Sequence, residues 1–192
     1  MNTPKTDRAN LPPAWAAAME LWSQEGKHHW IPVSGHSMVP VLREGDRILV
    51  SHQCAQIRAG DIIVFWQNGR LLIHRAVRLS GTLPDRVFLT KGDNTQHFDS
   101  PVNARDVIGR VIAIERGDRR FSIDTTAWRI LNRLVALIVV VETWLLDHGA
   151  DAKRKLLGNK PNRFTAFLRQ SITAPVALVL RILTTLLDRE NA

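Results

Sequence analysis

Cysteine is almost absent from this chain, and its first thirty residues hold no long apolar run. The one cysteine, Cys54, excludes an internal disulfide framework and a cysteine-based metal site, so we expect it to be a small side chain at the end of a strand. No early stretch reaches the roughly 7–15 apolar residues of a signal-peptide core, which predicts an untargeted N-terminus. No motif for a metal or a cofactor is found, and we expect neither.

Positive and negative charges are unequal. The chain has 192 residues, a formal net charge of +8 and a pI of about 10.7. Its apolar fraction of 45% and charged fraction of 23% are ordinary for a globular protein. The excess of positive charge favours an anionic partner, either a nucleic acid or an acidic lipid surface, and charge alone does not choose between them.

The character of the sequence changes twice, which predicts three regions. Residues 1–29 read as a polar arm and a short helix that follows Pro12-Pro13. Residues 30–120 hold short β-branched runs separated by glycine, which indicates a compact all-β domain. Residues 121–192 hold two apolar, helix-like segments, 127–147 and 163–189, joined by a basic linker that begins at Lys153. The expected fold is mainly β, with a short N-terminal helix and a C-terminal apolar helical hairpin.

Five strands are expected in the middle region, and turn residues separate them. The pair Asn68-Gly69 between two of them is a strong hairpin signal. Asp106, just before the last strand, is expected to be a solvated turn residue. The predicted strands are 48–50, 62–65, 71–73, 86–89 and 107–114.

The sharpest chemical signal is the segment 33–40, of sequence VSGHSMVP. Ser37 stands between a glycine and a proline, on constrained backbone that can present a hydroxyl at the surface of a strand-rich domain. A serine without a positioned base is a poor nucleophile. Taken alone, the segment could equally be a polar turn.

His74 follows three aliphatic residues in a predicted buried strand. Strand alternation places it on one face with Leu72 and Ala76, and places Arg75 on the other face. A surrounding of low polarity keeps an imidazole neutral, which suits it to accept a serine proton near neutral pH. The alternative is a core histidine that binds one backbone carbonyl.

Residues 90–99, TKGDNTQHFD, hold two acids six residues apart, Asp93 and Asp99. Gly-Asp-Asn is by itself a turn signal. Either acid could also orient an imidazole and stabilise it once it is charged, as in a serine triad.

Together these segments resemble the signal peptidase I superfamily of S24/S26-type serine peptidases. The resemblance runs from residue 33 to residue 112 and looks closest to the serine–histidine branch, in which His-Arg stands where other members carry a lysine base. This branch includes archaeal, endoplasmic-reticulum and sporulation-type signal peptidases. The resemblance implies a signal-peptidase-like catalytic domain with Ser37 as nucleophile, His74 as general base and Asp99 as the orienting acid. It also implies that Asp93 supports the site from its turn, and that the Ser37 amide forms an oxyanion hole to which Ser34 could contribute.

One residue in the acidic segment departs from the family pattern. His97 could compete with His74 for an acid, which leaves open whether Asp99 or Asp93 orients the base.

The expected location also departs from that family, whose members usually have an N-terminal membrane anchor. The two C-terminal segments could lie on an anionic membrane as a basic, apolar hairpin, or they could pack on the β domain. Trp128 and Trp144 suit a membrane interface. We expect membrane association, on the cytoplasmic face, and the alternative is a cytoplasmic protein.

Three functions fit the sequence. The first is a serine endopeptidase that cleaves a signal or leader peptide through an acyl-enzyme and selects small side chains before the scissile bond. The second is a self-cleaving, repressor-like regulatory domain, which the high pI permits, although that branch uses a lysine base. The third is a catalytically silent peptide-binding module. We favour the first, with a peptide or preprotein as partner and no nucleic acid; the sequence does not give the oligomeric state.

Overall fold

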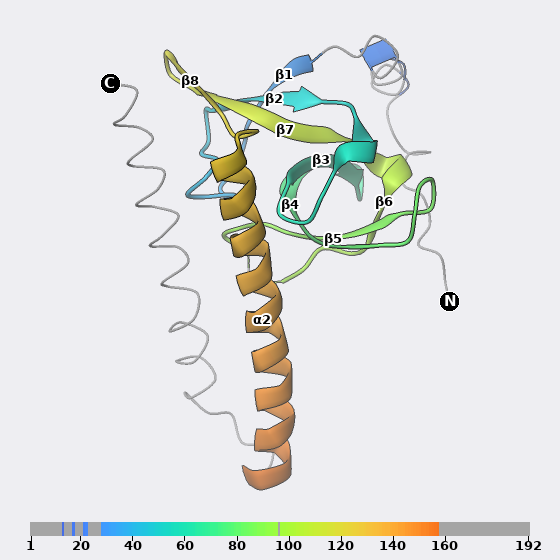
Figure 1. Ribbon diagram of the computed structural model, residues 1–192, viewed down its shortest axis with the longest axis vertical. Coiled ribbons are helices and arrows are strands. Elements are labelled where there is room, and N and C mark those ends of the chain that lie inside the picture. Colours follow the sequence, from blue (N-terminus) through green and yellow to red (C-terminus); the bar gives the residue numbers. More distant parts are fainter. Residues whose placement is uncertain (1–12, 14–16, 18–20, 23–27, 96, 158–192) are drawn as a thin grey trace.

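In the computed structural model, which describes residues 13, 17, 21–22, 28–95 and 97–157, eight strands form one antiparallel sheet and a long helix follows it (Figure 1). The strand order is β1-β2-β7-β3-β4-β5-β6, and β8 pairs with β7. The elements are β1 (His28–Pro32), β2 (Arg47–Ser51), β3 (Ile62–Gln67), β4 (Arg70–Ser80), β5 (Val87–Lys91), β6 (Val102–Asn103), β7 (Val107–Arg116), β8 (Arg119–Ser122) and α2 (Thr126–Leu157). The predicted, mainly β fold with a C-terminal helix is confirmed.

The five expected strands are all present as β2, β3, β4, β5 and β7. The predicted hairpin joins β3 to β4 through Asn68 and Gly69, whose φ angles of 52° and 73° are the left-handed pair that a tight hairpin needs. Strands β1, β6 and β8 were not predicted. Their sequences, HHWIP, VN and RRFS, are short or charged and lack an alternating apolar pattern.

Two apolar cores lie on the two faces of the sheet, and β3 contributes to both. Ile62, Val64 and Trp66 point into the core that α2 covers, whereas Ile63 and Phe65 point into the other core. Burial on both faces explains why β3 reads as a continuous apolar run instead of an alternating one. These cores hold in place β4, which carries His74, and the strands that flank the loops of Ser37 and Asp99.

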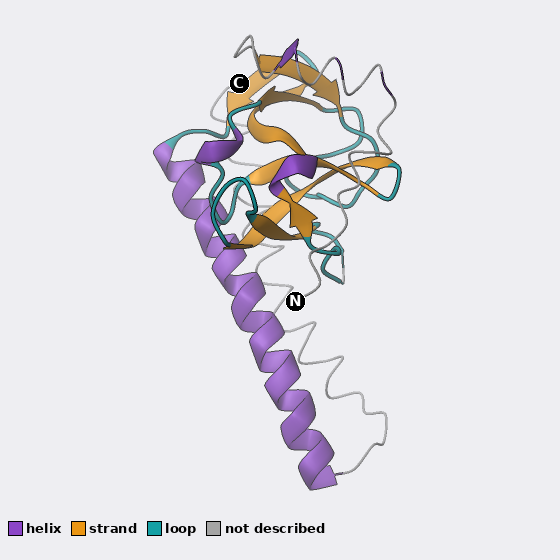
Figure 2. Cartoon of the chain, turned by 90° about the vertical axis from the view of Figure 1, so that its right-hand side faces the viewer, coloured by secondary structure: helices purple, strands orange, loops and turns teal. Residues whose placement is uncertain are grey.

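Helix α2 begins where Thr125 accepts a hydrogen bond from the Trp128 amide through its hydroxyl, at 3.3 Å. The predicted helix 127–147 is confirmed, but the helix continues to Leu157. The basic linker predicted from Lys153 therefore begins inside the helix, because alanine, lysine, arginine and leucine between 150 and 157 are good helix formers. Figure 2 shows that the strands lie beside the first part of α2, while its later turns extend away from the sheet.

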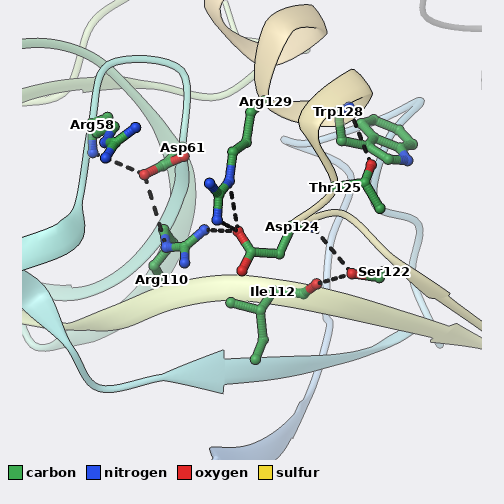
Figure 3. Close-up of polar contacts among 9 residues, drawn as sticks. All are labelled: Arg58, Asp61, Arg110, Ile112, Ser122, Asp124, Thr125, Trp128 and Arg129. Atoms are coloured by element: carbon green, nitrogen blue, oxygen red, sulfur yellow. Dashed lines mark hydrogen bonds and ion pairs between the residues drawn. The ribbon is translucent and has the colours of Figure 1, made fainter.

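A cluster of charges fixes the start of α2 to the sheet (Figure 3). Asp124 accepts hydrogen bonds from Arg110 of β7, at 2.5 Å, and from Arg129 of α2, at 2.9 Å. The Arg110 hydrogen bond, with that of Arg129, holds the pKa of Asp124 below its ordinary value of 3.8. Asp61 accepts a hydrogen bond from the Arg58 amide and lies 3.9 Å from Arg110, yet burial raises its pKa.

Trp128 does not lie at a free surface. It is 6% exposed and packs in the core between α2 and the sheet, as do Val135 and Ala136 nearby. The expectation that Trp128 suits a membrane interface is therefore wrong, since the helix turns this side chain toward the domain. Within the described ranges, no helix is long and apolar enough to cross a membrane.

Asp106 is also placed differently from the expectation. It ends a 3-10 turn (Ala104–Asp106) and is only 4% exposed, so it is not a solvated turn residue. The turn joins β6 to β7 and directs the carboxylate inward, where the Asn103 side-chain amide approaches it at 3.5 Å.

Two predicted helices lie wholly or mostly outside the described residues. These are the short helix after Pro12-Pro13 and the segment 163–189. Cys54 opens a 3-10 turn (Cys54–Gln56) soon after β2 ends.

Candidate functional site

Ser37 lies in the loop that joins β1 to β2. The base of the loop is closed by hydrogen bonds from Val33 N to Asp46 O, at 2.8 Å, and from Gly45 N to Val33 O, at 3.2 Å. Met38, directly after the serine, is buried at 3% exposure and anchors the loop in the core. The loop thus holds a half-buried serine at the surface on a fixed backbone.

His74 lies on β4, opposite Ile63 of the neighbouring strand β3. Its ring packs edge-on against Phe65, with centroids 6.1 Å apart, and its side chain is 8% exposed. Nδ1 of His74 and Oδ2 of Asp99 are 2.7 Å apart. Among the predicted site residues, His74 and Asp99 are therefore brought into direct contact, and Asp99 is the acid that meets the imidazole.

Asp99 follows β5 and is held there by Thr90. The Thr90 hydroxyl donates a hydrogen bond to Asp99 Oδ2, at 2.7 Å, and the Asp99 amide donates to the Thr90 carbonyl, at 2.9 Å. The same carboxylate oxygen thus contacts both Thr90 and His74. His97, the predicted competitor, is exposed, and no hydrogen bond joins it to either acid within the described part of the chain.

The turn after β5 brings the serine loop against the histidine. The Asn94 amide donates to the Ser37 carbonyl, at 2.7 Å, and the Asn94 side chain donates to the His36 carbonyl, at 3.1 Å. A Cβ atom on Gly92 would lie 2.7 Å from the Ser37 carbonyl oxygen and 3.1 Å from Nε2 of His74. Nε2 of His74 and the carbonyl oxygen of Ser37 therefore both lie beside Gly92, and the described contacts reach Ser37 through its backbone carbonyl.

This geometry also orients the amide of Ser37. In a planar trans peptide, the carbonyl of His36 and the N–H of Ser37 point in opposite directions. Because Asn94 holds that carbonyl, the Ser37 N–H is directed away from the turn. Ser34 lies exposed at the start of the loop, and within the described residues no hydrogen bond joins it to Ser37 or His74.

Asp93 does not reach the imidazole. It forms a two-bond pair with Arg75, from Nε to Oδ1 at 2.8 Å and from Nη2 to Oδ2 at 2.7 Å. The predicted alternation along β4 is confirmed, since His74 and Arg75 lie on opposite faces, toward Phe65 and toward α2. The Gly92–Asn94 turn therefore contacts both faces of β4. Gly92 lies beside His74 on one face, and Asp93 binds Arg75 on the other.

Sequence reasoning assigned no role to Thr90, Arg75 or Asn94. Arg75 was placed on the correct face, but its partner could be named only once the position of the turn was known. Within the described residues, no group of three or more histidine, cysteine or acidic side chains is placed to hold a metal ion.

Comparison with known proteins gives concordant matches. A family model described as Peptidase S24-like matches residues 2–112, more than half of the chain. The signal peptidase complex catalytic subunit SEC11 of Chaetomium globosum is 32% identical over 94 residues, which cover 43% of this chain and 55% of that protein. The subunit of the same name from Metarhizium acridum is 33% identical over 95 residues, with the same coverage. The chain spans about half the length of these curated relatives.

Proposed function

The chain belongs to the Peptidase S24-like family, as the sequence motifs predicted, and from this premise we propose that it is a serine endopeptidase that cleaves a signal or leader peptide. The observation that carries the proposal is the 2.7 Å contact between His74 and Asp99, made while Nε2 of the same imidazole and the Ser37 carbonyl both lie beside Gly92. A serine near an imidazole that a carboxylate orients is the arrangement that activates a hydroxyl for acyl transfer.

In the proposed reaction, Nδ1–H of His74 donates to Asp99, which leaves Nε2 as the proton acceptor. Nε2 takes the Ser37 proton as Oγ forms a bond to the carbonyl carbon of the scissile peptide bond. The Ser37 amide stabilises the oxyanion that develops, and Ser34 could add a second donor. The imidazolium then protonates the leaving amine as the C–N bond breaks, and an acyl-enzyme remains.

Water completes the reaction by the reverse sequence. His74 removes a proton from the water as its oxygen attacks the acyl carbon, and the same proton returns to Ser37 as the ester bond breaks. In this scheme Asp99 remains ionised and stabilises the imidazolium in both halves. Asp93 and Asn94 act on geometry alone, because their partners are Arg75 and the backbone of the serine loop.

The test is cleavage of a peptide library and of a preprotein by the purified full chain, with products identified by mass spectrometry. We expect cleavage after small side chains, and we expect Ser37→Ala and His74→Ala to abolish it while circular dichroism stays unchanged. His97→Ala, an exposed histidine close to the same turn, is the matched control and should cleave as the wild type does. Cleavage that survives in purified Ser37→Ala would overturn the proposal.

The two alternative functions predict different results in the same assay. A self-cleaving regulatory domain would cut its own chain at a rate independent of protein concentration and would leave added peptides intact. A silent binding module would bind peptides without cutting them. The relatives described above are signal peptidase catalytic subunits, which supports the endopeptidase.

We also propose that α2 carries the chain on an anionic membrane surface, with the active site on the cytoplasmic face. The side of the helix turned away from the sheet is strongly apolar although it is exposed, and the exposed Arg133 lies beside it. The exposed apolar residues of α2 are Ile130, Leu134, Leu137, Ile138, Val140 and Val141. An exposed apolar stripe beside a cation, in a chain with an excess of positive charge, suits an anionic lipid interface better than water.

A further inference from the structure

Arg75 connects the acidic turn to helix α2. Its side chain is fully buried, and all three of its guanidinium nitrogens are used. Nε and Nη2 bind Asp93, whereas Nη1 donates to the carbonyl of Gly60, at 2.8 Å, and to Oδ1 of Asn132, at 2.7 Å. Asn132 lies on α2, so the helix supplies one acceptor to the residue that follows the proposed base in sequence.

Asn132 is an unusual residue for its position. It is 3% exposed on a face of α2 otherwise formed by apolar side chains, including Trp128 and Val135. A buried amide is costly unless it is hydrogen-bonded. The contact with Arg75 satisfies its oxygen, and an uncharged acceptor adds no second negative charge beside the Arg75–Asp93 pair.

The position of Asn132 is itself fixed by close packing. A Cβ atom on Gly60 would lie 2.6 Å from the Asn132 carbonyl carbon, so the helix backbone sits directly on the turn before β3. Oδ1 of Asn132 and the Gly60 carbonyl therefore approach Nη1 from two elements that are locked together. The guanidinium has little room to move while this helix contact exists.

A continuous set of contacts runs from α2 to the serine loop. Asn132 binds Arg75, Arg75 binds Asp93, and the next residue, Asn94, holds the Ser37 carbonyl. The ion pair at its centre is almost dry, with side-chain exposures of 0% for Arg75 and 3% for Asp93. Hydrogen bonds in such surroundings are strong and directional, so the loss of one acceptor shifts the groups that depend on it.

We propose that Asn132 is a positioning residue for hydrolysis, through which docking of α2 sets the geometry of the Ser37 loop. The inference rests on the proposed endopeptidase function. Asn132 touches neither the imidazole nor the peptide, and it acts by holding Arg75. Helix α2 thereby contributes to the geometry of the proposed catalytic site as well as to the stability of the domain.

The experiment compares two substitutions of Asn132 in the full chain. Asn132→Leu removes the acceptor, and Asn132→Asp keeps an oxygen at the same place. We expect Asn132→Leu to lower kcat by about 10- to 100-fold, the usual loss for a small misplacement of reacting groups, with little change in KM. Asn132→Asp keeps the acceptor but adds a second carboxylate beside Arg75, so it should lose less kcat than Asn132→Leu without matching the wild type. If Asn132→Leu does not fold, Asn132→Ala takes its place.

Val135→Ala is the matched control, because it weakens the packing of α2 one turn away and leaves the Arg75 contacts intact. It should lower the melting temperature and keep kcat. Equal losses of kcat in Val135→Ala and Asn132→Leu would overturn the inference, since they would indicate general loosening of the helix. An unchanged kcat in a folded Asn132→Leu or Asn132→Ala protein would overturn it as well.

Amide hydrogen exchange separates this inference from the proposed function. Asn132→Leu should speed exchange at Asn94, whose amide binds the Ser37 carbonyl, and Val135→Ala should not. If the wild type cuts no peptide while this exchange pattern holds, the proposed function fails and the positional coupling stands. If exchange at Asn94 is unchanged in Asn132→Leu, the coupling fails even when Ser37-dependent cleavage is found.

Discussion

Oδ2 of Asp99 contacts both Nδ1 of His74 and the hydroxyl of Thr90, each at 2.7 Å. A carboxylate only accepts hydrogen bonds, so this contact makes Nδ1 the protonated nitrogen and leaves Nε2 free to accept a proton. At the scale of single residues, the tautomer of the imidazole is therefore set by one oxygen atom. The hydrogen bond from the Thr90 hydroxyl holds that oxygen of Asp99 in position.

Asp99→Asn tests this arrangement. The amide nitrogen can donate to Nδ1, which would place the imidazole proton on Nε2 and block acceptance of the serine proton. We expect kcat to fall by about 10³- to 10⁴-fold without unfolding, the range seen when a triad acid becomes an amide. Thr90→Val removes one hydrogen bond to the same oxygen and should cost less. A Thr90→Val loss equal to that of Asp99→Asn would contradict the role assigned to the carboxylate.

Gly92→Ala addresses the space between the serine loop and the base. The new methyl group would lie 2.7 Å from the Ser37 carbonyl, which is backbone, and 3.1 Å from Nε2 of His74. One of the two must move, so we expect kcat to drop by about 100-fold. Gly45→Ala, in the same loop but with open space around its Cβ, is the steric control and should change melting temperature more than kcat. Full activity in Gly92→Ala would show that the loop adapts without loss of geometry.

At the scale of elements, β4 shows what the sequence could and could not predict. Alternation along one strand is a local property, so the opposite faces of His74 and Arg75 were predictable. The partners of Arg75 were not, because Asp93 and Asn132 are 18 and 57 residues away and meet it only through turn geometry and helix docking. Strands β1, β6 and β8 were not predicted for a related reason. They form by pairing with neighbouring strands, and their own sequences have no alternating apolar pattern.

The docking of α2 makes stability depend on pH through Asp124. The folded-state pKa of Asp124 lies below 3.8, with the Arg110 hydrogen bond as the largest cause, so its contribution is present above that pH and is lost as pH falls through the lowered value. Asp124→Asn should cost about 1 kcal/mol of unfolding free energy at pH 7, because Asp124 is partly exposed. Urea titrations at pH 7 and at low pH measure this difference, which should shrink in acid.

Asp61 acts in the opposite sense and serves as the internal comparison. Burial raises its pKa, so its charged form disfavours the folded state at neutral pH, and this cost is relieved as pH falls. The free energy of unfolding of Asp61→Asn should therefore lie closer to that of the wild type at pH 7 than at low pH. The same pH trend in both variants would contradict the assignment of the two shifts.

At the scale of the whole molecule, the two faces of α2 have different surroundings. One surface packs on the sheet and reaches Arg75 through Asn132. The other presents six exposed apolar side chains beside Arg133, in a chain whose net charge is +8. The charge excess predicted an anionic partner from composition alone, and the helix offers a place where such a surface could meet apolar contacts as well.

Vesicle binding tests that arrangement in the full chain. Leu134 and Leu137 are 51% and 58% exposed, and transfer of two leucine side chains into an apolar phase favours binding by about 1.5–3 kcal/mol each. Leu134→Ser with Leu137→Ser should therefore weaken flotation with phosphatidylserine-containing vesicles by at least about tenfold. Leu83→Ser, at an exposed leucine in the β4–β5 loop, should leave binding unchanged. Equal binding to vesicles of phosphatidylcholine alone would contradict the electrostatic part of the proposal. Binding by the double variant as strong as that of the wild type would contradict the role of α2, because the apolar stripe would then not contact the lipid.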